Sequence, residues 1–115
     1  IIMSHFLLEC YLQKANQYDA LKVLEEHGED LKIGKLLTLL IDKDDNNKEC
    51  VFAKIGVDKI GCLSDEDSKV IRIFLKARWN DIFECRICKV DEKADENKRY
   101  SIVIKIKDHE VGHDE

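Results

Sequence analysis

Residues 42–64 read DKDDNNKECVFAKIGVDKIGCLS, and the other elements of the chain are most easily placed from this stretch. It opens with Asp, Asn and Lys residues, which are typical of an exposed loop, and continues with two apolar runs separated by Gly56. Ser64 then precedes acidic residues and apolar residues at helical spacing, the usual start of a capped helix. The stretch predicts a loop, a strand at 49–55, a strand at 58–63 and a helix at about 65–78.

The sequence on either side of this stretch predicts four more strands and a further helix. Three segments alternate between apolar and polar residues, as half-buried strands do, and a fourth is apolar without a polar phase. Asn16 as an N-cap and Gly28 as the residue after the C-cap delimit a helix at about 17–27. The expected strands are 5–13, 36–41, 83–87 and 100–107.

These elements predict a mainly β fold with two short helices. The strands are spread too evenly along the chain for alternating βαβ units, so we expect about six antiparallel strands in a small OB-like or SH3-like barrel. We expect residues 1–115 to form a single domain, with a core at about 5–107 and a frayed tail at 108–115.

The composition excludes several classes of function. The formal net charge of -5 argues against a strong non-specific duplex binder, because neutralisation of phosphates drives that binding, although it permits a local basic patch. No apolar run is long enough for a membrane helix, and the N-terminus lacks the features of a signal peptide. With five cysteines in that context, we expect free thiols, a cytoplasmic location and no membrane association.

The sequence contains neither a calcium loop nor a catalytic constellation that we would defend. The segment from Asp42 begins like a calcium loop, but Asn47 occupies the position of the required Gly and Ala53 that of the closing Glu. A glycine-rich phosphate loop, GxSxG and HExxH are all lacking from the sequence. We therefore predict a protein that is not an enzyme and has no cofactor.

A zinc site is a third, less favoured hypothesis. Cys85 and Cys88 form a CxxC pair, and His109 and His113 have the HxxxH spacing of zinc fingers. The gap between the pairs is longer than in those fingers, and strand alternation points the two cysteines to opposite faces unless a bulge intervenes. The alternative is that the cysteines are small buried hydrophobic residues.

Binding is the remaining class of function. OB-like barrels present aromatic side chains that stack on bases and basic side chains that contact phosphates. Tyr11 lies on the more polar side of its expected strand, where it is either such a platform or an ordinary outward tyrosine. The lysines near the predicted loop either give it a positive edge or belong to a solvated surface: Lys43, Lys48, Lys54 and Lys59.

The order of these motifs resembles the HIRAN domain family, found in certain SWI/SNF-type DNA translocases and as stand-alone bacterial proteins. The matching segments are KDDNNKE at residues 43–49, FAKI at 52–55 and KIGCLS at 59–64, the last followed by a helix. The segments LKIGKLLTL at 31–39 and IFECRICKV at 82–90 are similar to the strands that flank this core. The resemblance covers most of residues 5–107.

This resemblance implies an OB-like barrel that binds single-stranded DNA at a free 3′-hydroxyl end. A loop carboxylate accepts the hydrogen bond that a terminal hydroxyl donates, and Glu49 matches the family's loop aspartate. Tyr11 matches a stacking aromatic, Asn47 the loop amide and Lys43 the basic residue that opens the loop. The predicted nucleic-acid-binding residues are Tyr11, Lys43, Asp44, Asn47, Lys48, Glu49, Lys59 and Cys62.

Three positions depart from the family pattern. Lys48 stands in place of the loop's second aromatic residue, Cys62 in place of an aromatic or histidine, and Cys10 where arginine is often found. Loss of one stacking ring costs about 1–3 kcal/mol per base. We therefore expect a module that binds single-stranded DNA ends as an accessory to a DNA-processing or repair protein, and we keep as the alternative a protein-interaction or structural barrel that has lost DNA binding.

Overall fold

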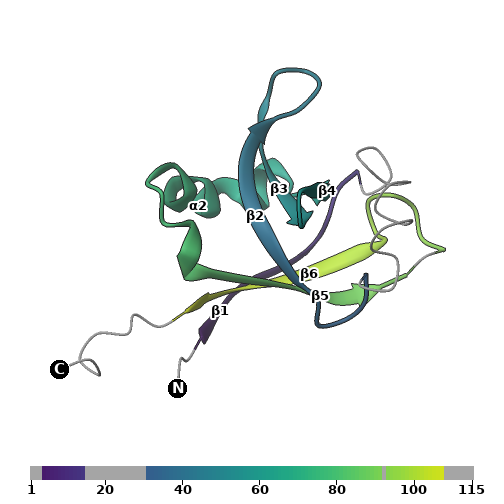
Figure 1. Cartoon of the computed structure of the whole chain (residues 1–115). Coiled ribbons are helices and arrows are strands. Elements are labelled where there is room, and N and C mark those ends of the chain that lie inside the picture. The colour runs from purple at the N-terminus through teal and green to yellow at the C-terminus, as the bar shows by residue number, and fades with distance from the viewer. Residues whose placement is uncertain (1–3, 15–30, 92, 108–115) are drawn as a thin grey trace.

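The computed structural model describes residues 4–14, 31–91 and 93–107, and these form a mainly β fold (Figure 1). Six strands and one α-helix account for most of this part of the chain. In chain order the elements are β1 (Ser4–Tyr11), β2 (Leu36–Lys43), β3 (Glu49–Ile55), β4 (Asp58–Cys62), α2 (Asp65–Lys76), a 3-10 turn (Asn80–Ile82), β5 (Phe83–Val90) and β6 (Tyr100–Lys107).

All six predicted strands and the helix after Ser64 are confirmed, with small differences at their ends. The strands form where side chains alternate between core and solvent, as the burial of Leu37 and Leu39 between exposed neighbours in β2 illustrates. The expectation of two helices is not met in the described residues, which contain α2 as their single α-helix. The helix expected at 17–27, the N-terminal residues 1–3 and the tail 108–115 lie outside the described part of the chain.

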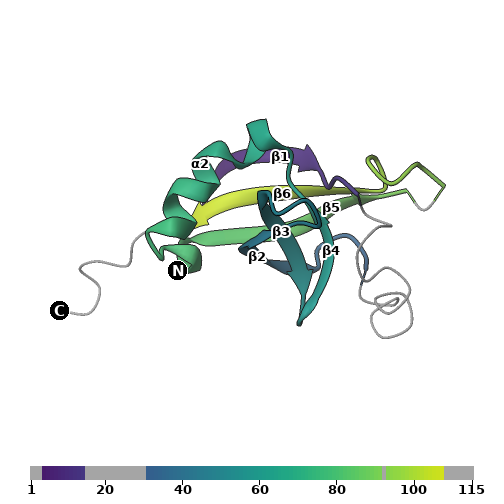
Figure 2. The ribbon, with the colours of Figure 1, turned by 90° about the horizontal axis from the view of Figure 1, so that it is seen from above.

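The strands form one antiparallel sheet in the order β1-β6-β5-β2-β3-β4. Its two halves are joined through few pairs: Leu36 with Arg86 and Leu37 with Cys85 link β2 to β5. Beyond these pairs β2 turns away from β5 and continues with β3, so that the two halves cross each other (Figures 1 and 2). This strong bend follows from the right-handed twist of β-strands.

The closed barrel that we expected is wrong as stated, because the described strands form an open sheet. The outer strands β1 and β4 approach each other only past the end of β1, through an isolated bridge between Gln13 and Cys62. Its backbone hydrogen bonds measure 2.7 Å from Gln13 N to Cys62 O and 3.0 Å from Cys62 N to Gln13 O. β4 forms its ladder with β3 on its other edge.

Helix α2 packs over the sheet next to β2 and β3 and completes the core. Ile71 of α2 is fully buried, and Phe74 of the same helix contacts Phe83 of β5 edge to face, with ring centroids 6.0 Å apart. Ser64 caps the helix, because its Oγ accepts a hydrogen bond from Asp67 N at 3.2 Å. In the described part of the chain, no helix is long and apolar enough to span a bilayer.

We expect the substitution Ser64→Ala to lower the free energy of unfolding by about 1 kcal/mol, the usual cost of losing an N-cap. The serine also donates a hydrogen bond to Asp67 Oδ2 at 2.9 Å, which alanine would leave unmade. Urea unfolding measures the effect, and Ser64→Thr, which keeps the capping hydroxyl, is the matched control. An unchanged midpoint for Ser64→Ala would show that the cap does not contribute.

Candidate functional site

A groove of about 300 Å³ opens where the β2–β3 loop, the start of α2 and the β5–β6 loop meet. Its lining comes from four separate parts of the sequence, and two of them overlap the motif segments at residues 43–49 and 59–64. The lining residues are Gln13, Lys14, Asp44, Lys48, Cys50, Cys62, Leu63, Ser64, Asp65, Glu96 and Asn97.

Two backbone features bring the N-terminal segment to the groove. The bridge between Gln13 and Cys62 ties the chain after β1 to the end of β4, and Lys14 N donates to Asn97 Oδ1 at 2.9 Å. Gly61 makes the close approach possible, because a Cβ on it would lie 3.0 Å from Gln13 O. The glycine of the KIGCLS motif therefore allows two segments that line the groove to pack closely against each other.

Asp44 organises the loop between β2 and β3. Its Oδ1 accepts hydrogen bonds from Asn46 N and Lys48 N, both at 2.9 Å, while its carbonyl accepts from Asn47 N. The φ of 63° at Asn47 suits the tight reversal. These bonds, led by that from the Lys48 backbone, hold the pKa of Asp44 below its usual range, so its carboxylate is ionised at neutral pH.

The second oxygen of Asp44 is much less engaged. Within the described residues, Oδ2 accepts a hydrogen bond from the Cys50 Sγ at 3.7 Å, and a thiol is a weak donor. Burial is the main reason that the pKa of Cys50 is raised, and the negative charge of Asp44 adds to it. The groove therefore contains an ionised carboxylate oxygen that can accept a stronger hydrogen bond.

Lys48 connects the loop to the start of α2. Its Nζ lies 2.5 Å from Asp65 Oδ2, and this hydrogen bond raises the pKa of Lys48 and lowers the pKa of Asp65. Both side chains are more than half exposed, so water and salt weaken the pair. Lys48 is thus positioned as a cation beside Asp44 without being held in a buried ion pair.

The structure places Glu49, the predicted acceptor of a terminal hydroxyl, away from the groove. As the first residue of β3 it points to the opposite side from Cys50, toward α2, where Lys76 Nζ lies 2.9 Å from its Oε1. Arg72 and Lys43 are also close enough to contribute, after the Lys76 hydrogen bond, to the lowered pKa of Glu49. Asp44, and not Glu49, is the loop carboxylate that lines the groove.

The remaining predicted residues also lie outside the lining of the groove. Lys59 Nζ bonds to Asp42 Oδ2 at 3.0 Å and lies 4.2 Å from the centroid of Phe52. Tyr11 stands on β1, with Lys89 Nζ 3.4 Å from its hydroxyl. Lys43 is exposed at the end of β2, and Asn47 is exposed in the loop. Of the eight predicted residues, the groove brings together Asp44, Lys48 and Cys62.

The described residues contain no group of three or more His, Cys, Asp or Glu side chains that could hold a metal ion, and all five cysteines are free. Burial raises the pKa of Cys85 far above its usual range, whereas a zinc ligand must be a thiolate. An irregularity of the strand register falls at Cys88, whose Sγ lies 3.4 Å from Ser101 Oγ. His109 and His113 lie outside the described residues, so the zinc hypothesis stays a prediction.

Several residues of this region had no motif to reveal them. Lys14, Asp65 and Asn97 reach the groove only through tertiary contacts, since they come from three distant parts of the chain. The cations of α2 were detectable in part: Arg72 and Lys76 are four residues apart, a spacing that places them on one face of a helix.

Comparison of the chain with models of protein families, with curated proteins and with solved structures finds no match. The resemblance to HIRAN domains therefore rests on the residues of this chain alone.

Proposed function

We propose that this protein is a non-enzymatic module that binds the 3′-hydroxyl end of single-stranded DNA in the groove. The observation that carries the proposal is the pairing of an ionised, incompletely bonded Asp44 oxygen with the Lys48 ammonium in one groove. A terminal hydroxyl donates a hydrogen bond to such an oxygen, whereas an internal phosphodiester has no proton to donate. Lys48 and Lys14 are the cations available to the last phosphates.

The order of the loop, glycine and helix motifs supports a HIRAN-like origin for this site. The bridge from Gln13 to Cys62 brings the two edges of the open sheet together next to this site. In this proposal Asp44 takes the role that the sequence assigned to Glu49. A DNA-processing protein that exposes 3′ ends, in the cytoplasm, is the proposed partner.

The substitution Asp44→Asn tests the proposal. The amide keeps an oxygen for the Asn46 and Lys48 backbone bonds but replaces the accepting Oδ2 with a donor. We expect affinity for a strand ending in 3′-hydroxyl to fall about tenfold, since a hydrogen bond to a charged group contributes roughly 1.5 kcal/mol or more. Fluorescence anisotropy at low salt, with strands ending in 3′-hydroxyl or 3′-phosphate, measures it.

Asp45→Asn is the matched control, because it removes the same charge from the same loop at an exposed residue outside the groove lining. The unsubstituted protein should prefer the hydroxyl end, and the control should retain this preference. Equal binding to both ends would leave only a general electrostatic contact. Absence of binding to either strand would refute the proposal.

A protein-interaction or structural role is the second candidate. It is favoured by the groove's lining, which among the described residues includes no aromatic side chain and pairs Lys48 with Asp65. Failure of both strands to bind at low salt would favour this candidate.

A further inference from the structure

Three cations form a line along α2. Lys69, Arg72 and Lys76 follow one another at spacings of three and four residues, which places them on one face, about 4.5 and 6 Å apart along the axis. The buried residues Ser68 and Ile71 belong to a different face of the helix. Basic residues in the last turn complement the helix dipole, but this accounts only for Lys76 and not for the two cations before it.

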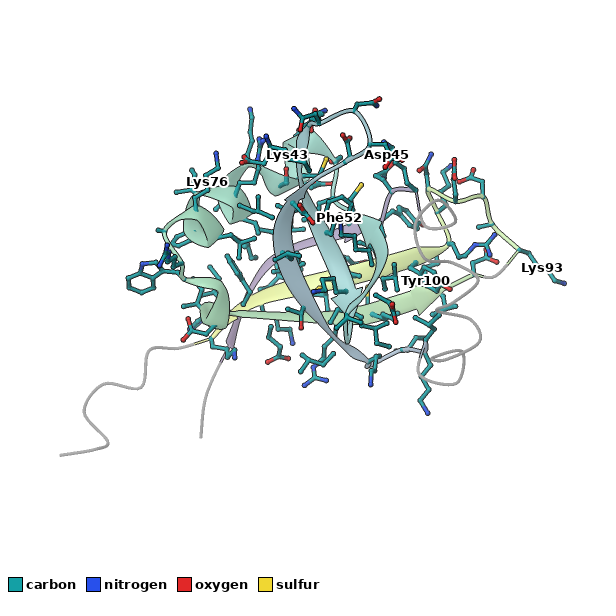
Figure 3. All side chains as sticks on the ribbon, turned by 45° about the horizontal axis from the view of Figure 1, so that its top comes forward. Lys43, Asp45, Phe52, Lys76, Lys93 and Tyr100 are labelled. Atoms are coloured by element: carbon teal, nitrogen blue, oxygen red, sulfur yellow. The ribbon has the colours of Figure 1, made fainter. Side chains whose placement is uncertain are left out.

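A fourth cation reaches the same surface from β2. Glu49, at the start of β3, is the carboxylate between β2 and α2. Lys76 forms an ion pair with it, and the positive charges of Arg72 and Lys43 also lower its pKa. Three cations thus surround Glu49, and Asp65, the other carboxylate close to Arg72, is paired with Lys48. Figure 3 shows Lys43 and Lys76 on the same side of the molecule. We call the surface made by Lys43, Lys69, Arg72 and Lys76 the α2 ridge; its excess positive charge stands out in a chain with a net charge of -5.

An exposed aromatic side chain follows the ridge. Trp79 is 54% exposed, and its backbone N–H donates to Phe74 O at 2.9 Å, which fixes the chain just beyond α2. Ile73, 67% exposed, lies on the same outward side of the helix. A cationic track with an aromatic platform is the combination that binds single-stranded nucleic acid, because every base can stack on a ring.

The ridge is continuous with the groove. Asp65, the first residue of α2, lines the groove and pairs with Lys48. The positive charge of Arg72 also helps to lower the pKa of Asp65. From there the twelve-residue helix leads about 18 Å to its other end, near Trp79. The groove supplies an acceptor for the strand end but no described aromatic residue, and Trp79 supplies the ring that the groove lacks.

We propose that a single strand whose 3′ end occupies the groove continues along α2, with its phosphates on the α2 ridge and a base stacked on Trp79. This inference rests on the function proposed above and adds the path of the strand. The proposed partner is an anionic polymer that carries bases. A purely acidic peptide has no base that could stack on Trp79.

The double substitution Lys69→Gln, Arg72→Gln tests the path and leaves the Lys76–Glu49 pair intact. The test uses oligothymidylates of about 4 and about 12 nucleotides that end in 3′-hydroxyl. The shorter strand is expected to occupy the groove alone, and the longer strand to reach the α2 ridge as well. We expect affinity for the longer strand to fall roughly five- to tenfold and its log–log salt slope to shrink by about 1.4, since each lost phosphate contact contributes about 0.7. The shorter strand should bind as before.

Trp79→Ala should lower affinity for the longer strand about tenfold, within the range for loss of one stacked base, while Trp79→Phe should retain most of it. The double substitution Lys32→Gln, Lys93→Gln is the charge-matched control, since both lysines are exposed in loops outside α2. In Figure 3, Lys93 points away from the molecule on the side opposite α2.

The outcomes separate the two proposals. If the ridge variants bind the longer strand normally while the preference for 3′-hydroxyl over 3′-phosphate persists, the ridge inference is overturned and the groove stands. If the ridge variants lose affinity but keep that preference, both are supported. If the unsubstituted protein does not bind either strand, or does not prefer the 3′-hydroxyl end, both proposals are overturned. If polyglutamate competes as strongly as the oligonucleotide does, the α2 ridge is not a nucleic-acid surface.

Discussion

Replacing Phe52 with alanine is expected to lower the free energy of unfolding by about 3–5 kcal/mol, the largest loss that we predict for a single substitution. Phe52 has no exposed surface. It lies on β3 between Leu40 of β2 and Cys62 of β4, in the middle of the three strands on this side of the sheet. Lys59 lies over the ring, at 4.2 Å from its centroid, and would lose this cation–π contact as well.

A loss of this size is a large share of the roughly 5–15 kcal/mol that stabilises a typical domain. Urea unfolding followed by circular dichroism measures it, and an unchanged slope with denaturant would show that the unfolding reaction itself is the same. Phe6→Ala is the matched control, because Phe6 is 65% exposed on β1 and its truncation should change stability by no more than about 0.5 kcal/mol. Equal costs for the two substitutions would contradict the burial of Phe52.

Replacing Gly61 with alanine is expected to destabilise the protein by about 1–3 kcal/mol through overpacking. The new Cβ would lie 3.0 Å from both Gln13 O and Leu12 Cβ, and neither neighbour is the end of a flexible side chain. Leu12 is fully buried and Gln13 forms the bridge to Cys62, so the strain falls on the contact that brings the outer strands together.

The sign of the Gly61→Ala effect is informative. The φ of Gly61 is not in the left-handed region, so alanine could adopt this backbone conformation without strain. In open space the substitution would stabilise the protein by about 0.4–1 kcal/mol, because alanine has less freedom in the unfolded chain. Thermal unfolding decides between these results, and a raised melting temperature would disprove the close approach.

The residues of the candidate site were harder to predict from sequence than the strands. The resemblance assigned the hydroxyl acceptor to Glu49, but strand alternation turns Glu49 toward α2 and Cys50 toward the groove. The acceptor that we propose, Asp44, is close to the strand in sequence, and only the folded loop shows that one of its oxygens is bound by backbone N–H groups while the other is not.

Local chemistry determined the secondary structure. Alternation of apolar and polar residues specified three of the strands, and short apolar runs specified the other three. Ser64 with the acidic residues after it specified the start of α2, because these preferences depend on neighbours within a few residues. The sequence also showed that residues 42–64 combine the loop, the glycine motif and the capped helix.

Tertiary structure alone decided the shape of the sheet and the charge distribution at the site. β1 and β4 meet at a single bridge, and this depends on how β2 bends away from β5 after two residue pairs. Lys48 pairs with Asp65, which is 17 positions away in the sequence. Arg72 and Lys43, which are 29 positions apart and lie on different elements, are likewise brought together around Glu49. Such contacts depend on the packing of α2 against the sheet, which no local pattern encodes.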